Sequence, residues 1–252
     1  METNSELESE IKENGYFLLK DFFPKDTIIQ IKGILDKANG EWKKHNSNPN
    51  TINSAYLTST KFLPYEKERD QLFQFIASIP IIKICKTLFI SDFYFLNTQI
   101  FFNPIDLNQR PYWHRDIQYM GISEEEQKSK ILKDFVWHFR IPLEEDPGIW
   151  IVPGSHNRWD TEEERNIRLE LGSHQNDEPI KNAILIPHQP GDLFVFSAHL
   201  LHKGEYGKNR FSFDILFTNF PESKDVVENW DHFPNWEFSS LTPSQRKMFI
   251  TK

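Results

Sequence analysis

The chain has 252 residues, a hydrophobic fraction of 38%, a charged fraction of 26% and a formal net charge of −8. An acidic protein lacks the basic surface that attracts nucleic acids and anionic membranes, so we expect neither as a partner. No apolar run approaches the length of a membrane span. These features exclude the common classes of nucleic-acid-binding and membrane-spanning proteins and leave a globular protein.

The cysteine content and the first residues predict a reducing location. Cys85 is the only cysteine and has no internal partner for a disulfide. The acidic start, Met1 to Glu13, lacks the basic and apolar regions of a signal peptide. We therefore expect a cytoplasmic protein. The 22 Phe, 7 Trp and 7 Tyr residues suit the walls of a closed β-architecture with an apolar pocket.

The first third of the chain is predicted to be mainly helical. Helical spacing of apolar residues is clearest between Lys25 and Lys44, where Ile28, Ile31 and Leu35 recur on one face. The other expected elements are a short polar helix at Ser5–Asn14, a strand at Gly15–Lys20, and helices at Glu66–Ser78 and Ile81–Leu88. Asn46–Asn53 has the composition of a loop.

From Phe93 onward the apolar period changes to that of strands. Strands are expected after Phe93 and at Phe135–Leu143, Ile149–Val152, Ile184–Ile186, Leu193–Phe196 and Arg210–Phe217. Asp146–Gly148 is predicted to be a turn, Glu124–Lys133 a charged helix or surface loop, 157–182 a polar segment over the site, and Thr242 or Ser244 the cap of a last helix.

Short strands without βαβ alternation, after a helical beginning, predict an α+β protein that is mainly β. The expected core is a double-stranded β-helix, a cupin-like jelly roll, with the N-terminal helices packed on one sheet. We expect one domain over residues 1–252, with a helical part at about 1–90, the jelly roll at about 93–220 and a tail at about 221–252.

His114-Arg115-Asp116 places an imidazole and a carboxylate two residues apart. On an extended segment, residues i and i+2 point to the same face. A second histidine from elsewhere in the chain would complete the two-histidine, one-carboxylate triad that binds non-haem Fe(II) and leaves positions open for other ligands. The triplet also matches the His-Arg-Asp of a protein-kinase catalytic loop. That alternative fails, because position 121 is Gly where the kinase pattern requires Asn.

His202 follows the strand Leu193–Phe196, and Arg210 opens the next strand. If Arg210 faces the interior, strand alternation sends Ser212 and Asp214 to the same side and four apolar side chains to the opposite, packed side. A buried arginine requires a partner, which can be a ligand carboxylate held by the guanidinium. The alternative is a structural ion pair with Asp214 or Asp192.

Together, these motifs resemble those of the phytanoyl-CoA dioxygenase family of Fe(II)- and 2-oxoglutarate-dependent oxygenases. The resemblance covers nearly the whole chain. It is carried by Gly15–Phe23, Trp113–Asp116 with Tyr119, Gly148–His156, Gly191–Phe196 with His202–Gly204, and Leu241–Arg246. Two departures are a Gly148–His156 segment one residue shorter than the family pattern and a short gap, 210 − 202 = 8 positions, between His202 and Arg210.

The resemblance assigns His114, Asp116 and His202 to Fe(II) and Arg210 to the distal carboxylate of 2-oxoglutarate. It also suggests that Ser212 and Gln99 contact this co-substrate, and it favours His202 over His199 as the third metal ligand. His156, in the Pro-Gly-Ser-His turn, is expected to be structural or to support the site.

The chemistry that this family implies consumes O2 and 2-oxoglutarate and releases succinate and CO2. Related halogenases carry Ala or Gly in place of the metal-binding aspartate, so Asp116 predicts hydroxylation or another oxidation. The leading hypothesis is therefore an oxygenase acting on a small organic molecule. The alternative is a non-catalytic or Zn-binding jelly-roll protein that uses the fold for binding. The sequence leaves the substrate and the oligomeric state open.

Overall fold

The computed structural model describes residues 4–207, 209–220, 230–237 and 239–249. Its α-helices are α1 (Asn4–Asn14), α2 (Lys25–Lys44), α3 (Glu66–Ile76), α4 (Ile79–Leu88), α5 (Glu124–Lys130), α6 (Glu162–Arg168) and α7 (Pro243–Arg246). Its strands are β1 (Tyr16–Leu19), β2 (Asn53–Ala55), β3 (Tyr94–Phe102), β4 (Val136–Pro142), β5 (Asp146–Ile151), β6 (Ile184–His188), β7 (Leu193–Ser197), β8 (His202–Gly204) and β9 (Phe211–Thr218). Short 3-10 helices are η1 (Asp116–Met120), η2 (Ser155–Asn157), η3 (Trp230–His232) and η4 (Lys247–Phe249).

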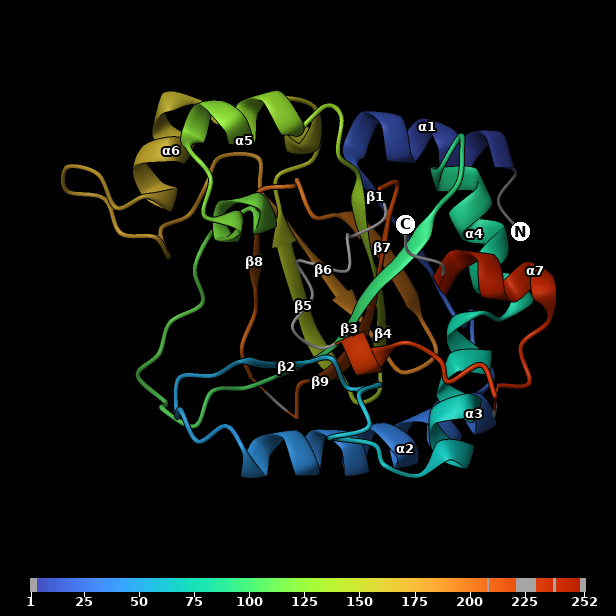
Figure 1. The fold of residues 1–252 in the computed structure, drawn as a ribbon. Helices are drawn as coiled ribbons and strands as arrows, with labels where there is room; N and C mark the ends of the chain where they lie inside the picture. The colour runs from blue at the N-terminus through green and yellow to red at the C-terminus, as the bar shows by residue number, and fades with distance from the viewer. Residues whose placement is uncertain (1–3, 208, 221–229, 238, 250–252) are drawn as a thin grey trace.

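The strands form two sheets in which all the described pairings are antiparallel. The larger sheet has the order β1-β7-β4-β9-β3-β2 and the smaller one β6-β5-β8. Ile149 and Ile151 of the smaller sheet pack with Phe194 and Phe196 of the larger one in a single apolar cluster. The two sheets therefore face each other over this cluster, and Figure 1 shows them together at the centre of the molecule.

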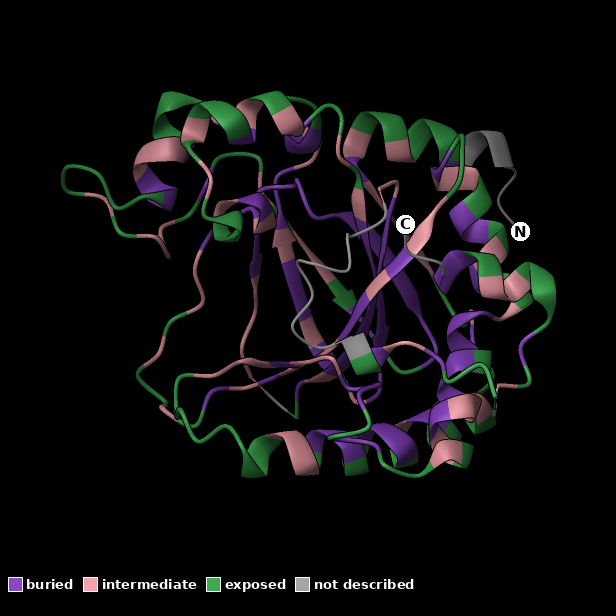
Figure 2. Ribbon diagram, in the orientation of Figure 1, coloured by how far each residue is buried: buried purple, intermediate pink, exposed green. Residues whose placement is uncertain are grey.

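Helices α2, α3 and α4 cover the other face of the larger sheet. Their apolar side chains join one core cluster with those of the central strands, among them Ile31, Leu72, Ile81, Phe139 and Phe213. In Figure 1 these helices lie along the right and lower sides, whereas α5 and α6 lie at the upper left. Figure 2 shows that most of the strand residues at the centre are buried or partly buried, whereas the helices have exposed residues on their outward faces. The expected packing of N-terminal helices on one sheet is confirmed.

Strand β9 has the alternation that the sequence predicts. Phe213, Ile215 and Phe217 point into the helix-covered core. Asp214 and Leu216 point to the opposite face, where Leu216 lines a cavity. One strand therefore contributes to the core on one side and to the cavity on the other.

Several element boundaries differ from the predicted ones. The predicted turn at Asp146–Gly148 is wrong, because these residues begin β5. Their turn chemistry appears instead as a bulge, where Gly148 has φ +122° and its N–H donates to the Asp146 carboxylate at 2.9 Å. The sequence predicts no strand at β2 or β8, which have three residues each. In the expected tail, Thr242 caps α7, and residues 221–229, 238 and 250–252 lie outside the described part.

In the described part of the chain, no single helix has the length and apolar character to cross a membrane. Only the pair α3 and α4 meets both criteria when taken together, and the two helices are bent by 45° at their junction.

Candidate active site

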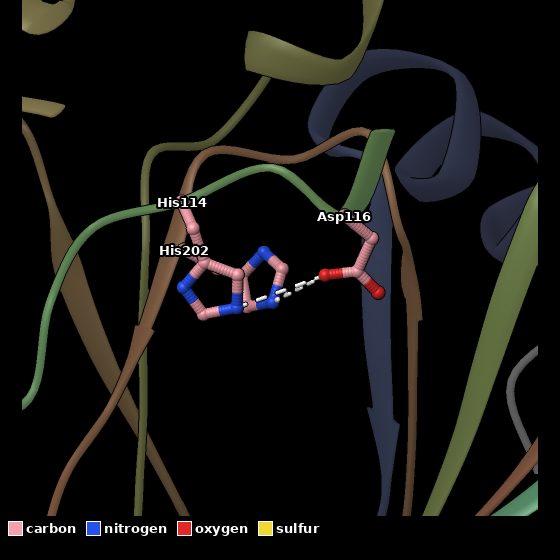
Figure 3. Close-up of side chains that lie close together, drawn as sticks. All are labelled: His114, Asp116 and His202. Carbon is pink, nitrogen blue, oxygen red and sulfur yellow. Dashed lines mark ion pairs between the residues drawn. The ribbon is translucent and has the colours of Figure 1, made fainter. Parts of the chain in front are cut away.

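Three predicted side chains, His114, Asp116 and His202, meet at one point (Figure 3). Their ligand atoms all lie within 4.8 Å of one another. Asp116 Oδ1 is 3.7 Å from His114 Nε2 and 3.5 Å from His202 Nε2. Two imidazoles and one carboxylate at this spacing are a donor set that fits Fe(II).

The backbone brings the two histidines together. His114 and His202 form an antiparallel bridge, in which each N–H donates to the other's carbonyl oxygen, at 2.9 and 3.0 Å. Their ring centroids are consequently only 4.2 Å apart. The extended segment before Asp116 then turns into η1, and this turn directs the carboxylate back toward the rings.

Hydrogen bonds set the tautomer of both imidazoles. His114 Nδ1 lies 3.0 Å from the Tyr112 carbonyl oxygen, and His202 Nδ1 lies 2.9 Å from the Leu200 carbonyl oxygen. A carbonyl oxygen only accepts, so each Nδ1 carries the proton and each Nε2 keeps its lone pair for a metal. Burial lowers the pKa of His114, and it lowers the pKa of His202 to about 3. Both rings are therefore neutral at neutral pH.

Asp116 is held by a second layer of charged groups. Its Oδ2 accepts from His138 Nε2 at 2.7 Å, and His138 Nδ1 lies 2.9 Å from Asp214 Oδ2. Both ring nitrogens of His138 face carboxylates, so both carry protons. Burial alone would lower the pKa of His138, but the bonds to Asp116 and Asp214 outweigh it and raise the pKa to about 9.

His138 therefore supports the Asp116 carboxylate of the triad, a role that the sequence did not assign to it. A histidine on a strand can point to either face, so the sequence alone left its direction undecided. His138 and Arg140, two residues apart on one strand, point to the same face, and both line the cavity.

Arg210 lies at the far end of the same cavity, fully enclosed. Its Nε is 3.8 Å from Asp146 Oδ2, and neither Nε nor Nη1 has a hydrogen-bond partner among the described residues. The two carboxylates considered from the sequence are engaged elsewhere: Asp214 pairs with Arg140 and Asp192 with Lys20. Asp146, which the sequence placed in a turn, is thus the counter-ion of the predicted anchor.

Asp146 is itself fixed by several contacts. The Ser212 hydroxyl donates to Asp146 Oδ2, the Gly148 N–H donates to Oδ1, and His188 Nε2 lies 3.6 Å from Oδ2. Ser212 is not among the cavity-lining residues, whereas Gln99, which pairs with Asp214 in the ladder of β3 and β9, is among them. The structure thus brings Gln99 to the cavity surface and places Ser212 behind Arg210, against its counter-ion.

A cavity of about 620 Å³ contains these groups. It is lined by all three residues of the triad, by Arg210 and by Gln99. Its apolar walls include Ile52, Leu96, Ile117, Met120, Val136 and Leu216. None of the lining residues comes from 124–133 or 157–182, so neither segment contributes to the cavity wall. Cover of the site by the polar segment stays a prediction. The lining combines charged groups with apolar side chains, which suits an anionic co-substrate beside a less polar molecule.

His199 and His156, the other two histidines considered for the site, have separate roles. His199 Nε2 bonds to the backbone carbonyl of Asp134, and His199 does not belong to the group of close ligand atoms, although it lines the cavity. His156 is buried against Gly15, whose position would bring an added Cβ within 2.4 Å of the His156 Nδ1 atom. His156 thus packs the Pro-Gly-Ser-His turn against the N-terminal segment.

Known structures with a similar fold include EctD, SnoN and AviO1. EctD from S. alaskensis, solved with 2-oxoglutarate and 5-hydroxyectoine, has a TM-score of 0.63 and 14% identity, covering 98% of this chain and 87% of that one. SnoN, a non-haem α-ketoglutarate-dependent epimerase from nogalamycin biosynthesis, has a TM-score of 0.61 and 13% identity, covering 96% of each chain. AviO1 from Streptomyces viridochromogenes Tue57 has a TM-score of 0.57 and 16% identity, covering 86% and 95%. At such identities the similarity is one of fold.

A comparison with curated proteins finds no significant match. The family model described as phytanoyl-CoA dioxygenase (PhyH) matches residues 11–210, which is most of the chain. The matched region contains His114, Asp116, His202 and Arg210. The chain therefore belongs to the phytanoyl-CoA dioxygenase family, whose members use Fe(II) with 2-oxoglutarate and O2.

Proposed function

We propose that this protein is an Fe(II)- and 2-oxoglutarate-dependent oxygenase that hydroxylates a small organic metabolite and releases succinate and CO2. The observation that carries the proposal is the joint presence of the His114–Asp116–His202 triad and the buried Arg210 in one cavity. The balanced reaction takes one substrate C–H, one O2 and one 2-oxoglutarate, and gives one C–OH, one succinate and one CO2.

The proposed roles follow from the position of each side chain. His114, Asp116 and His202 hold the metal, and Arg210 receives the distal carboxylate of 2-oxoglutarate through its unpartnered Nε and Nη1. Gln99 contacts the same co-substrate from β3. Ser212 supports the anchor through Asp146. When bound, Fe(II) supplies the activation of O2, and the protein orients the substrate and keeps bulk water away.

Hydroxylation is proposed in preference to halogenation because Asp116 occupies the metal-facing position that a halide would need. His138 holds this carboxylate at 2.7 Å, so Asp116 is fixed toward the metal position. The apolar part of the cavity, formed by residues such as Leu96, Ile117 and Leu216, suits the carbon skeleton of the substrate. A cavity of about 620 Å³ accommodates a metabolite and a co-substrate rather than a macromolecule.

We also propose that the two facing sheets are a double-stranded β-helix, or jelly roll. In this proposal residues 1–252 form one oxygenase domain. The net charge of −8 and the single cysteine support a cytoplasmic enzyme without nucleic-acid or membrane partners.

A binding assay and a turnover assay test the proposed function. Anaerobic protein with Fe(II) and 2-oxoglutarate is expected to show the weak visible charge-transfer band of this class, and to release succinate in air. Asp116→Ala should lower succinate release by more than about 100-fold, since even partners of metal ligands cost 10–100-fold. Glu125→Ala changes an exposed ion pair on α5 and should leave the rate unaltered. An iron-loaded protein without the band at saturating 2-oxoglutarate would instead support the non-catalytic or Zn-binding alternative.

A further inference from the structure

Arg140 on β4 is a second buried guanidinium in the cavity. It is 2% exposed and lies among the cavity-lining residues. Its Nε and Nη2 donate to the two carboxylate oxygens of Asp214, at 2.7 and 2.8 Å. The remaining terminal nitrogen, Nη1, is buried and has no hydrogen-bond partner in the described part of the chain. A buried donor without a partner is unfavourable, so this nitrogen is a candidate for a ligand.

Aromatic contacts place Arg140 between the metal site and Arg210. Its guanidinium carbon is 5.5 Å from the centroid of the Phe196 ring, and that ring is 5.4 Å from the ring of His202. The Arg140 carbon is also 4.3 Å from the centroid of Phe101, and the Arg210 carbon is 5.6 Å from the same centroid. Arg140 therefore contacts Phe196, whose ring neighbours His202, and also Phe101, a ring that it shares with Arg210.

The sheet register gives the same order. Arg140 pairs with Asp214 in the ladder of β4 and β9, whereas Arg210 precedes the first residue of β9. The ring of His138, two residues before Arg140, is hydrogen-bonded to Asp116 of the triad. Along the cavity wall the cationic groups thus run from His138 at the metal, through Arg140, to Arg210.

A ligand with two carboxylates suits the two buried guanidinium groups of this cavity. Arg140 and Arg210 each keep a terminal nitrogen, Nη1, without a hydrogen-bond partner in the described part of the chain. 2-Oxoglutarate has two carboxylates, one for each guanidinium.

We propose that Arg140 is a second carboxylate anchor for the co-substrate: its Nη1 binds the carboxylate next to the 2-oxo group, while Arg210 binds the distal one. This inference rests on the proposed function. It assigns one guanidinium to each end of the dianion, and it gives the buried Nη1 the charge-assisted hydrogen bond that it lacks. Asp214 then acts as a positioning residue, because its two carboxylate oxygens fix the plane of the Arg140 guanidinium.

The opposing interpretation is that Arg140 only pairs with Asp214 to hold β4 against β9. Two kinds of variant separate the interpretations. Arg140→Lys keeps a positive charge for Asp214 but has no second nitrogen for a ligand. The double variant Arg140→Met with Asp214→Asn removes the ion pair without leaving a buried charge, and the amide still offers an acceptor to His138. A cooperative unfolding transition, measured for each variant, serves as the control that the variant is folded.

The measurement is binding to Mn(II)-loaded protein by calorimetry, with 2-oxoglutarate and with pyruvate, a 2-oxo acid that lacks the distal carboxylate. Both Arg140 variants should weaken the binding of both ligands by a similar factor, about 10- to 100-fold for one lost charged hydrogen bond. Arg210→Met should weaken 2-oxoglutarate and leave pyruvate nearly unchanged.

Three results would overturn the assignment in different ways. Unchanged binding in both Arg140 variants would make Arg140 a purely structural residue. A loss confined to 2-oxoglutarate would place Arg140 at the distal carboxylate with Arg210. Absence of 2-oxoglutarate binding to the metal-loaded wild-type protein would overturn the proposed function itself, and the inference with it.

Discussion

Arg115 stands between two residues of the triad, yet its side chain turns away from them. It is fully buried, and its guanidinium lies 2.7 Å from Asp160 Oδ1. It also donates to the backbone carbonyls of Ser155 and His199. Asp160 in turn pairs with Arg168 of α6 at 2.6 Å. Arg115 thus ties the segment that carries His114 and Asp116 to the Pro-Gly-Ser-His turn and to α6.

Replacing Arg115 should therefore reduce stability strongly. Arg115→Met leaves the buried Asp160 with one partner instead of two and removes the hydrogen bonds that Arg115 donates to the Ser155 and His199 carbonyls. We expect the free energy of unfolding to fall by about 3–5 kcal/mol, the usual loss when one member of a buried ion pair is removed. Urea unfolding measures it. Arg110→Ala is the matched control, because its pair with Asp177 is on the surface and should contribute little. A loss as small as that of the control would contradict this role for Arg115.

At the scale of single residues, the sequence identifies those whose chemistry is recognisable by residue type and spacing. His114, Asp116 and His202 meet as predicted, and Arg210 is buried in the same cavity. The supporting groups were not predictable. His138 lies on a strand whose inward face the sequence left open, and Asp146 occupies a bulge that has the composition of a turn.

The N-terminal segment docks onto the Pro-Gly-Ser-His turn through backbone contacts. Gly154 N–H donates to the Asn14 carbonyl oxygen at 3.0 Å, and Asn157 Nδ2 donates to the Lys12 carbonyl oxygen at 2.7 Å. Gly15, at the junction of α1 and β1, has φ +80° and lies against the ring of His156. A glycine is required here both for its backbone conformation and for the close approach.

Gly15→Ala is expected to destabilise the protein. The added Cβ would lie 2.4 Å from His156 Nδ1, and alanine disfavours a positive φ, so α1 and β1 must shift. We expect a loss of about 2 kcal/mol or more, measured by thermal or urea unfolding. Gly40→Ala is the opposite control: Gly40 lies in α2 with nothing within 4 Å of an added Cβ, and alanine should stabilise the helix by about 0.5–1 kcal/mol. Equal stability of the two variants would show that the junction tolerates a side chain.

Elements were predictable where a long apolar period fixed them. The bounds of α2, Lys25–Lys44, agree with the sequence, because its apolar residues keep helical spacing over many turns. Strand β8 contains three residues, too few for an alternation, and is defined only by its pairing with β5. Such elements arise from tertiary contacts that no local pattern reports.

At the scale of the whole molecule, the cavity joins segments that are remote in sequence. Its lining comes from residues near Ile52, from the triad segment, from β4 and from the stretch around His202 to Arg210. The sequence indicated the chemistry of this cavity but not its walls, because their order depends on how the two sheets face each other. Residues 157–182, the predicted cover, and residues 124–133 contribute no lining residue.

Metal binding should stabilise the entire fold, since its ligands belong to distant segments. Mn(II) added to metal-free protein at about 100 times its dissociation constant should raise the free energy of unfolding by about 2.7 kcal/mol. Thermal unfolding with and without Mn(II) measures this effect, and a chelator should reverse it. Asp116→Ala should lose most of the shift. An equal shift in that variant would place the bound metal elsewhere.

The bridge between His114 and His202 uses backbone atoms alone. The pairing of the two segments is therefore independent of the side chains that would carry out the chemistry. The two positions, 202 − 114 = 88 apart in sequence, are joined without any contribution from their imidazoles. Substitutions at 114 and 202 can therefore abolish or alter metal chemistry while the pairing of the two segments persists. A fold built in this way can exchange reactivity over evolutionary time, because the hydrogen bonds that assemble the site are independent of the groups that react in it.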